Sequence, residues 1–519
     1  MSVGLKSKGG FYIPKFLGRL KTRIPLHAGR EEERTPYLYI WLGFFAYSVL
    51  VAAAIQFIIL PYIFPGWHEG GGLLKGLDCV WFHNLAVELS QQILARGWSA
   101  WELRPSGQAP SGIAGAIYAL TVPKLWTTIP LNAVLHATAA YILFRILQMF
   151  TSGWKMAVLL VCPFLLYPSS VTWLSQNHKD GYTIAGAFLF VYGWILLLRT
   201  DTWNSWTRPL KSILFIFPGA VLCWIVRPYT IELLKGAGIL IALLATVTYL
   251  VRMARRQLPV SQLISAVLLV WALIYVLHLP LFPGSRSFFA HEGAPAKMDQ
   301  SAAEKLNMAV EKLDMKSNER TESLIMEISS KYLPDPVMTM LRLTEKRLAG
   351  LALYRRDYMF GYPNAKSYID PNIKLHNMDD YISFVPRAMQ IAFLSPFPSM
   401  WFGQGSVEQN TLMRRISAFE MIFLYFCLLG IPISVYYFYR RPEFWVVIIF
   451  CTSILLVYGF GMPNAGTLYR MRYGFIMMIA AMGLTGHCLF FRKLQRRRGV
   501  HSSAGLEITP VISDASSDS

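Results

Sequence analysis

The feature that most constrains this chain is a series of apolar runs that are long enough to cross a lipid bilayer. A hydrocarbon core about 30 Å thick requires a helix of about 20 apolar residues, and several runs of about that length occur here. Hydrophobic residues make up 54% of the chain and charged residues only 15%. In a soluble domain, about a quarter of all residues are charged. The sequence therefore predicts an all-α polytopic membrane protein.

About ten transmembrane helices follow from the apolar runs. They are expected at about 38–64, 127–149, 155–174, 181–199, 211–228, 233–251, 261–281, 416–438, 443–461 and 473–491. No strict internal repeat is visible, which weighs against a transporter built from duplicated halves.

The net charge of +19 includes basic clusters near both ends of the chain. Clusters of Lys and Arg precede the first span and follow the last, and such clusters mark the cytoplasmic side of a membrane. We therefore expect a multi-pass membrane protein with both termini in the cytoplasm. No binding motif accompanies the basic tails, so the charge does not indicate a nucleic-acid partner. We expect the basic tails to bind membrane lipids.

These spans divide the chain into five parts. The parts are a basic cytoplasmic tail (1–37), spans one to seven with the first extracytoplasmic loop at 65–125 (38–281), a large extracytoplasmic helical insertion (282–413), spans eight to ten (414–491), and a polar cytoplasmic tail predicted to be disordered (492–519). In the insertion, the mixed charge of 302–332 predicts water-facing helices. Its aromatic, Pro-broken end at 381–403 has the composition of an element lying in the interface.

Ionisable residues near the spans collect on the outer side. Ionisable groups at membrane depth are costly and usually mark a function, so these residues predict a site at the outer membrane–water boundary. The members are Asp78, His83, Glu88, Lys179, Asp180, Arg227, Arg470 and Arg472.

Each candidate has a structural alternative. Asp78 could accept a proton from an attacking hydroxyl or cap the helix that follows it. Lys179 and Asp180 could bind a phosphate and support a base, or could cap and anchor a span. Arg470 and Arg472 could hold phosphate oxygens in a fork geometry or contact ordinary lipid headgroups.

A metal site is not indicated. Arg227 could likewise bind phosphate or contact lipid headgroups, but its sequence context indicates phosphate binding less strongly than that of Arg470 and Arg472. His83 is interpreted as a packing residue because no pattern of His, Asp and Glu has the spacing of metal ligands. The cysteines show neither a disulfide framework nor metal-binding spacing. No cofactor is therefore expected.

The first outer loop resembles that of the GT-C glycosyltransferases, polytopic enzymes that use sugars linked to polyprenyl phosphate. The resemblance lies in an acid just after the first span, an aromatic and an "A..L" helix, a Gly turn, and a segment leading to "A-x-Y-A-L". Here these are Asp78, Phe82, Ala86–Leu89, Gly97–Trp98, Pro110–Gly112 and Tyr118–Leu120. "PSSVTWLSQNHKD", "VRPY", "VPRAMQIAFLSPFP" and "NAGTLYRMRY" also resemble segments of membrane proteins from bacterial exopolysaccharide clusters.

Two departures from the GT-C pattern stand out. Many members have paired acids, but Cys79 follows Asp78 here, and the large insertion at 282–413 lies in the middle of the chain. A lone carboxylate is a poor site for a divalent metal, so the departure at Cys79 makes metal dependence less expected.

The resemblance implies transfer of a sugar from a polyprenyl-phosphate donor to a glycan or lipid acceptor on the extracytoplasmic face. Asp78 would be the base, and Arg470 and Arg472, with Lys179 or Arg227, would neutralise the departing phosphate. A polysaccharide polymerase or ligase acting on a lipid-diphosphate-linked oligosaccharide is an alternative. So is a non-catalytic transporter or a partner in an export complex, for which an acid at position 78 is not required.

The orientation can be tested with topology reporters. Fusions after residues 100 and 350 are expected to report an extracytoplasmic location, and fusions after 205 and 500 a cytoplasmic one, because the Lys/Arg clusters lie on the cytoplasmic side. A cytoplasmic signal from the fusion after residue 350 would contradict a site on the outer face.

Overall fold

The described part of the chain is almost entirely helical in its regular structure. A computed structural model describes residues 35–75, 78–199, 207–283, 323–362, 365–405 and 408–497. Within these residues the strands form a single short hairpin, β1 (His68–Gly70) with β2 (Leu73–Leu74). The predicted all-α polytopic membrane architecture is confirmed.

Nine helices among the described residues are long and apolar enough to cross a membrane, and a bent pair brings the number to ten. Their elements are α1 (Tyr37–Ala54) continued by the π-helix η2 (Ile55–Ile63), α4 (Ile129–Gln148), α7 (Asp180–Leu198), α8 (Thr207–Val226), α9 (Thr230–Ala254), α10 (Val260–His278), α16 (Glu408–Leu429) with α17 (Ile431–Phe438), α18 (Pro442–Gly461) and α19 (Ala465–Arg497). Each lies where the apolar runs predict a span.

The third span differs from the prediction of one helix over 155–174. It consists of α5 (Trp154–Leu166) and α6 (Pro168–Leu174), which meet at an angle of 71°. Pro168 has no N–H to donate to the preceding turn, and its ring disfavours a helical conformation at Tyr167. The helix therefore ends at Leu166 and restarts in a new direction.

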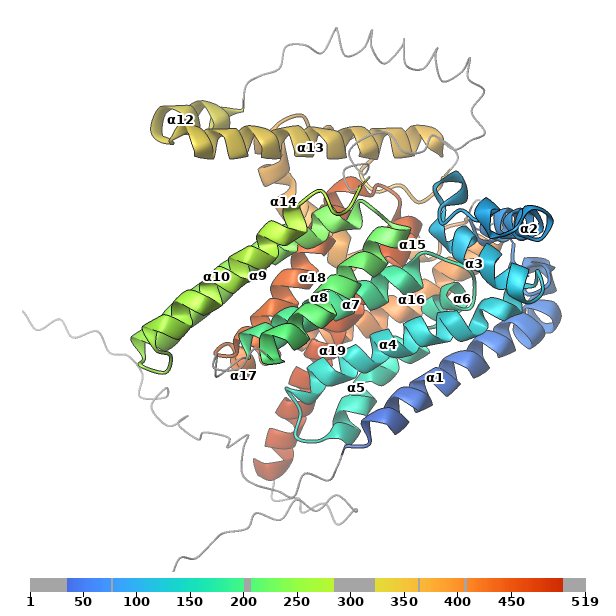
Figure 1. Cartoon of the computed structure of the whole chain (residues 1–519), viewed down its shortest axis with the longest axis horizontal. Coiled ribbons are helices and arrows are strands. Elements are labelled where there is room, and N and C mark those ends of the chain that lie inside the picture. The colour runs from blue at the N-terminus through green and yellow to red at the C-terminus, as the bar shows by residue number, and fades with distance from the viewer. Residues whose placement is uncertain are drawn as a thin grey trace, which may run out of the picture. The chain divides into compact units, whose positions relative to one another are not determined.

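Helices that are not counted among the spans gather at one end of the bundle, which we call the loop face. They are α2 (Asp78–Arg96), α3 (Ala109–Leu120), α12 (Leu324–Tyr332), α13 (Asp335–Gly361), α14 (Met378–Leu394) and α15 (Pro398–Trp401), together with the 3₁₀ turns η3 (Pro65–Trp67), η4 (Trp98–Ala100), η5 (Pro105–Gly107) and η6 (Leu125–Thr128). In Figure 1, α13 runs across the bundle, and α2 and α3 lie at the side of the bundle.

Part of the predicted organisation lies outside the described residues. This holds for residues 1–34 of the basic tail, for 284–322 of the insertion and for 498–519 of the polar tail. The element predicted for the interface at 381–403 corresponds to α14 and α15, which flank the Ser395–Pro396 bond.

Close packing at glycine fixes α19 against its neighbours. A Cβ added to Gly483 would lie well inside van der Waals contact with the carbonyl oxygen of Cys427 in α16, and one added to Gly430 would meet the carbonyl oxygen of Gly483. Small residues let helix backbones approach closely in a membrane, where packing replaces the hydrophobic effect as the driving force. The crossing of α19 with α16 and α17 depends on these glycines.

We expect Gly483→Ala to lower the free energy of unfolding by about 1–3 kcal/mol, because the added methyl group overpacks a backbone contact. Gly236→Ala in α9 is the matched control, since no heavy atom lies within 4 Å of its added Cβ. The control should be neutral or more stable by up to about 1 kcal/mol. Unfolding in mild detergent measures both, and equal behaviour of the two variants would contradict the close crossing.

Candidate active site

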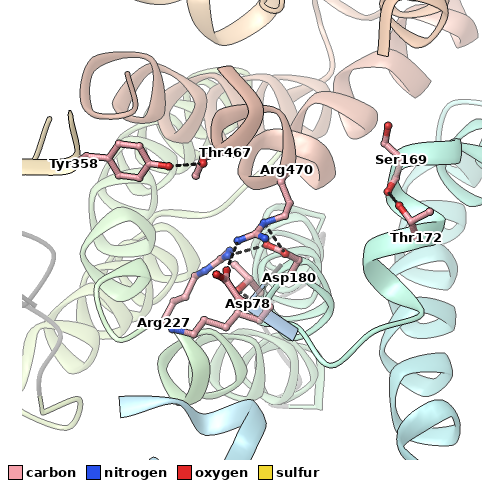
Figure 2. A network of polar contacts seen from close by, with 10 residues as sticks. Asp78, Ser169, Thr172, Asp180, Arg227, Tyr358, Thr467 and Arg470 are labelled. Atoms are coloured by element: carbon pink, nitrogen blue, oxygen red, sulfur yellow. Dashed lines mark hydrogen bonds and ion pairs between the residues drawn. The ribbon is translucent and has the colours of Figure 1, made fainter. Parts of the chain in front are cut away.

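Arg470 connects two carboxylates at the loop face. Its Nη2 lies 3.2 Å from Oδ2 of Asp78 in α2, and its Nε lies 3.3 Å from Oδ2 of Asp180 in α7. Arg227, just after α8, places its Nη2 2.8 Å from Oδ1 of Asp180. Figure 2 shows the four side chains converging from four separate elements. We call Asp78, Lys179, Asp180, Arg227 and Arg470 the ion cluster.

Asp180 and Arg227 each lie at the helix end that favours their charge. Asp180 is the first residue of α7, and Arg227 follows the last residue of α8. An acid is favoured at the positive N-terminal end of a helix and a cation at the negative C-terminal end. The two ends lie side by side because α7 and α8 are antiparallel neighbours with Gly186 packed against the carbonyl oxygen of Gly219.

The two acids of the cluster differ in their access to solvent. The Asp78 side chain is 52% exposed, whereas that of Asp180 is 4% exposed. A buried carboxylate requires compensating charge, and Arg227 and Arg470 provide it for Asp180. Asp78 has only part of its surface covered by Arg470, so its carboxylate remains open to an incoming molecule.

Lys179 is the third cation of the ion cluster. Its Nζ lies 5.7 Å from the centroid of the Phe82 ring in α2. Burial lowers the pKa of Lys179 to about 8, and the charge of Arg227 contributes to the shift. Burial and Arg470 likewise lower the pKa of the neighbouring His178 to about 4. With that imidazole neutral at pH 7, three basic and two acidic side chains leave a net charge of +1.

The segment before Lys179 ties the loop after the first span to the bundle. Gln176 accepts a hydrogen bond from Leu74 N–H and donates one to Gly72 C=O. Asn177 donates to Pro110 C=O, and Gln56 of η2 donates to Ser175 C=O. The polar run "SQNH" between two apolar segments is the sequence signal for this role. These bonds fix Lys179 and Asp180 relative to α2.

Arg472 lies away from the ion cluster. It is buried and donates hydrogen bonds to the carbonyl oxygens of Ala392 and Ser395 at the end of α14, and it contacts Met421 Sδ. Residues two apart on a helix point in nearly opposite directions, about 200° from each other. The sequence suggested Arg470 and Arg472 as joint phosphate ligands, but only Arg470 faces the cluster. A cation at these carbonyls compensates the C-terminal end of α14.

His83 and Glu88 also lie outside the ion cluster. His83 Nδ1 lies 2.8 Å from the Tyr118 hydroxyl in α3, and burial lowers the pKa of this imidazole. Glu88 is exposed and accepts a hydrogen bond from Gln92 one turn later on α2. Within the described residues, no three His, Cys, Asp or Glu side chains converge as metal ligands would.

A second polar network was missed in the sequence. Glu420 of α16 is buried and accepts hydrogen bonds from the N–H and hydroxyl of Ser169 at the start of α6 and from the Tyr469 hydroxyl. The Arg472 guanidinium lies over the ring of that tyrosine, 5.4 Å from its centroid. An acid inside the apolar run "ISAFEMIFLY" is the available signal, but its partner Ser169 is remote in sequence.

Tyrosines of α13 border the ion cluster. The Tyr358 hydroxyl lies 2.6 Å from Thr467 Oγ1 in the first turn of α19 (Figure 2). Tyr362, one turn later, is half-exposed; burial raises its pKa, and the charge of Asp78 raises it further. The helix α13 therefore brings aromatic surface to the open side of Asp78.

Comparison with known proteins identifies no relative: the chain matches no protein-family model, no curated protein and no solved structure.

Removing Arg227 tests the energetics of the cluster. Arg227→Met is expected to lower the free energy of unfolding by about 3–5 kcal/mol, because it leaves the Asp180 carboxylate buried with one counter-charge fewer. The double variant Arg227→Met/Asp180→Asn should recover much of this loss. The exposed pair Lys331–Glu327 provides the control, since Lys331→Ala removes an ion pair worth no more than about 1 kcal/mol. Unfolding in detergent measures all three, and equal losses in the single and double variants would refute the pairing.

Proposed function

We propose that this protein is a membrane glycosyltransferase that takes a sugar from a polyprenyl-phosphate donor at the loop face. The observation that carries the proposal is the ion cluster: a half-exposed carboxylate stands beside a guanidinium that a buried acid holds in place. A base and an anion-binding group are then adjacent. Transfer from a lipid phosphate requires both, one for the attacking hydroxyl and one for the leaving group.

The proposed reaction forms one glycosidic bond and breaks one bond to phosphate. An acceptor hydroxyl oxygen attacks the anomeric carbon of the donor sugar, and its proton passes to the Asp78 carboxylate. The bond between the anomeric carbon and the phosphate oxygen breaks, and its electron pair leaves with the polyprenyl monophosphate. Charge developing on that phosphate is stabilised by fixed cations, which act strongly where water is excluded.

The two acids take different parts in this step. Asp180 is a positioning residue, because its contacts with Arg227 and Arg470 fix two guanidinium groups before the donor arrives. Fixed donors need no reorganisation during the reaction. Asp78 has the exposure needed to meet an acceptor. The net charge of +1 at the cluster favours an anionic lipid phosphate over a neutral ligand.

The distribution of Lys and Arg supports an extracytoplasmic location for the loop face. The acceptor is then a growing cell-surface glycan or a glycolipid in a bacterial inner membrane. A panel of purified polyprenyl-phospho-sugars and diphosphate-linked oligosaccharides tests the donor class. Turnover of diphosphate donors alone would replace this proposal with that of a polymerase or ligase, and absence of turnover and binding with either class would favour a non-catalytic role.

We expect Asp78→Asn to abolish transfer while leaving expression and donor binding near normal. The amide keeps the size of the side chain but loses the basicity, and general-base catalysis typically contributes about 10²–10⁴-fold in rate. Glu88→Gln is the matched control, because Glu88 is an exposed acid on the same helix and should retain full activity. Asp78→Ala should be equally inactive. If Asn is active and only Ala is impaired, Asp78 stabilises its helix and is not the base.

Donor affinity should fall as the pH rises through about 8. Lys179 has a pKa of about 8, so it is a cation below that pH and neutral above it, whereas a phosphodiester stays anionic throughout. If binding requires the protonated amine, the affinity falls by up to about tenfold per pH unit above 8. Lys179→Met should bind weakly at pH 7 and show no such slope up to pH 9. An unchanged slope in the variant would assign the titration to another group.

A further inference from the structure

The helices α12 and α13 present an apolar face that continues beyond the bundle. In its C-terminal half α13 packs on the end of α18, where Leu351 is 2% exposed and fills the space beside Gly461. Arg355 in the same half donates to the carbonyl oxygen of Phe460. These contacts identify the side of α13 that faces the bundle.

Between Val337 and Leu343 the same side of α13 is apolar but is not covered, and further along this side Arg347 contacts the bundle. Met340 lies eleven residues before Leu351, which is about three helical turns and the same face. Met340 is nevertheless 68% exposed, and Val337 and Leu343 near it are also exposed. The opposite side carries the exposed residues Arg342 and Lys346. Met338 also lies on that opposite side and is buried, so the uncovered apolar surface of this half is the strip of Val337, Met340 and Leu343.

The preceding helix α12 repeats this pattern. Leu324, Ile328 and Tyr332 are spaced four residues apart, so they lie along one face, and all three are exposed, Tyr332 by 81%. The first turn of α12 is fixed by Asp379 of α14, whose Oδ2 accepts a hydrogen bond of 2.7 Å from Leu324 N–H. Figure 1 shows α12 and the start of α13 projecting past the spans.

Contacts with the spans set the depth of this helix pair. Arg347 Nη2 lies 3.8 Å from Oε2 of Glu232, which belongs to the first turn of α9. Because α9 begins and α18 ends at the loop face, α13 lies where the hydrocarbon core gives way to the headgroups. An uncovered apolar face at this depth meets lipid. Lys and Arg on the other side of such a helix reach the headgroup phosphates.

We propose that α12 and the N-terminal half of α13 form an interfacial anchor that inserts its apolar face, from Leu324 to Leu343, into the lipid leaflet at the loop face. The helix pair then rests on the bilayer at one end and on the bundle at the other. This proposal is independent of the enzymatic one.

Site-specific fluorescence in vesicles tests the anchor. Met340→Cys and Arg342→Cys are made in the full chain with the six native cysteines replaced, labelled with bimane, and reconstituted into vesicles of phosphatidylcholine and phosphatidylglycerol. Two residues apart, the labels lie on nearly opposite sides of the helix. Ile328→Cys and Ser330→Cys are the corresponding pair in α12.

We expect a nitroxide-labelled lipid to quench the labels at 340 and 328 several-fold more than those at 342 and 330, and aqueous iodide to show the reverse preference. Iodide quenching of all four labels would overturn the proposal in favour of a water-exposed hairpin. Protection of 340 and 328 from both quenchers would overturn it in favour of a protein cover. Such protection would point to a second copy if it weakened on dilution of the protein in lipid, and to another segment of this chain if it did not.

Discussion

The buried pair of Asp180 and Arg227, shared with Arg470, is the interaction on which the arrangement of the loop face depends. It joins the start of α7, the end of α8 and the first turns of α19 at a single point. A buried ion pair of this kind contributes little net stability compared with an apolar substitute, but leaving one partner alone is costly. Its effect is therefore specificity: only one relative placement of the three helices satisfies every charge. Asp78 then brings α2 to the same point through its contact with Arg470.

A second polar network lies on the other side of α19. Glu420 and Arg472 are separated by the ring of Tyr469, whose hydroxyl donates to the acid while its face meets the guanidinium. Glu420 also accepts a hydrogen bond from the N–H of Ser169, at the start of α6 in the broken third span. Buried polar groups are costly unless they are fully satisfied. The α19 helix thus carries one charge network on each side, and each network fixes a different set of neighbours.

The positions of the spans could be predicted from the sequence because apolar length is a local property. All ten predicted runs correspond to helices, and the bend of 71° at Pro168 lies at a residue visible in the sequence. The depth of the ion cluster was also predictable, since Asp78, Lys179, Asp180, Arg227 and Arg470 all flank spans on one side. The direction in which each side chain points around its helix could not be predicted. Nothing local to "YRMRY" distinguishes Arg470 from Arg472, because the partners of each come from segments far away in the chain.

The glycine crossing of α19 has a consequence for how the site can move. With Gly483 and Gly430 pressed against backbone carbonyls, α19 can neither turn about its axis nor slide along it without steric overlap. Arg470 is therefore a stationary part of the site. Asp78 differs, because it stands at the head of a surface helix and half of its side chain is already in solvent. An opening for the proposed lipid-linked substrate would then move α2 away from this arginine and break the contact between Asp78 and Arg470.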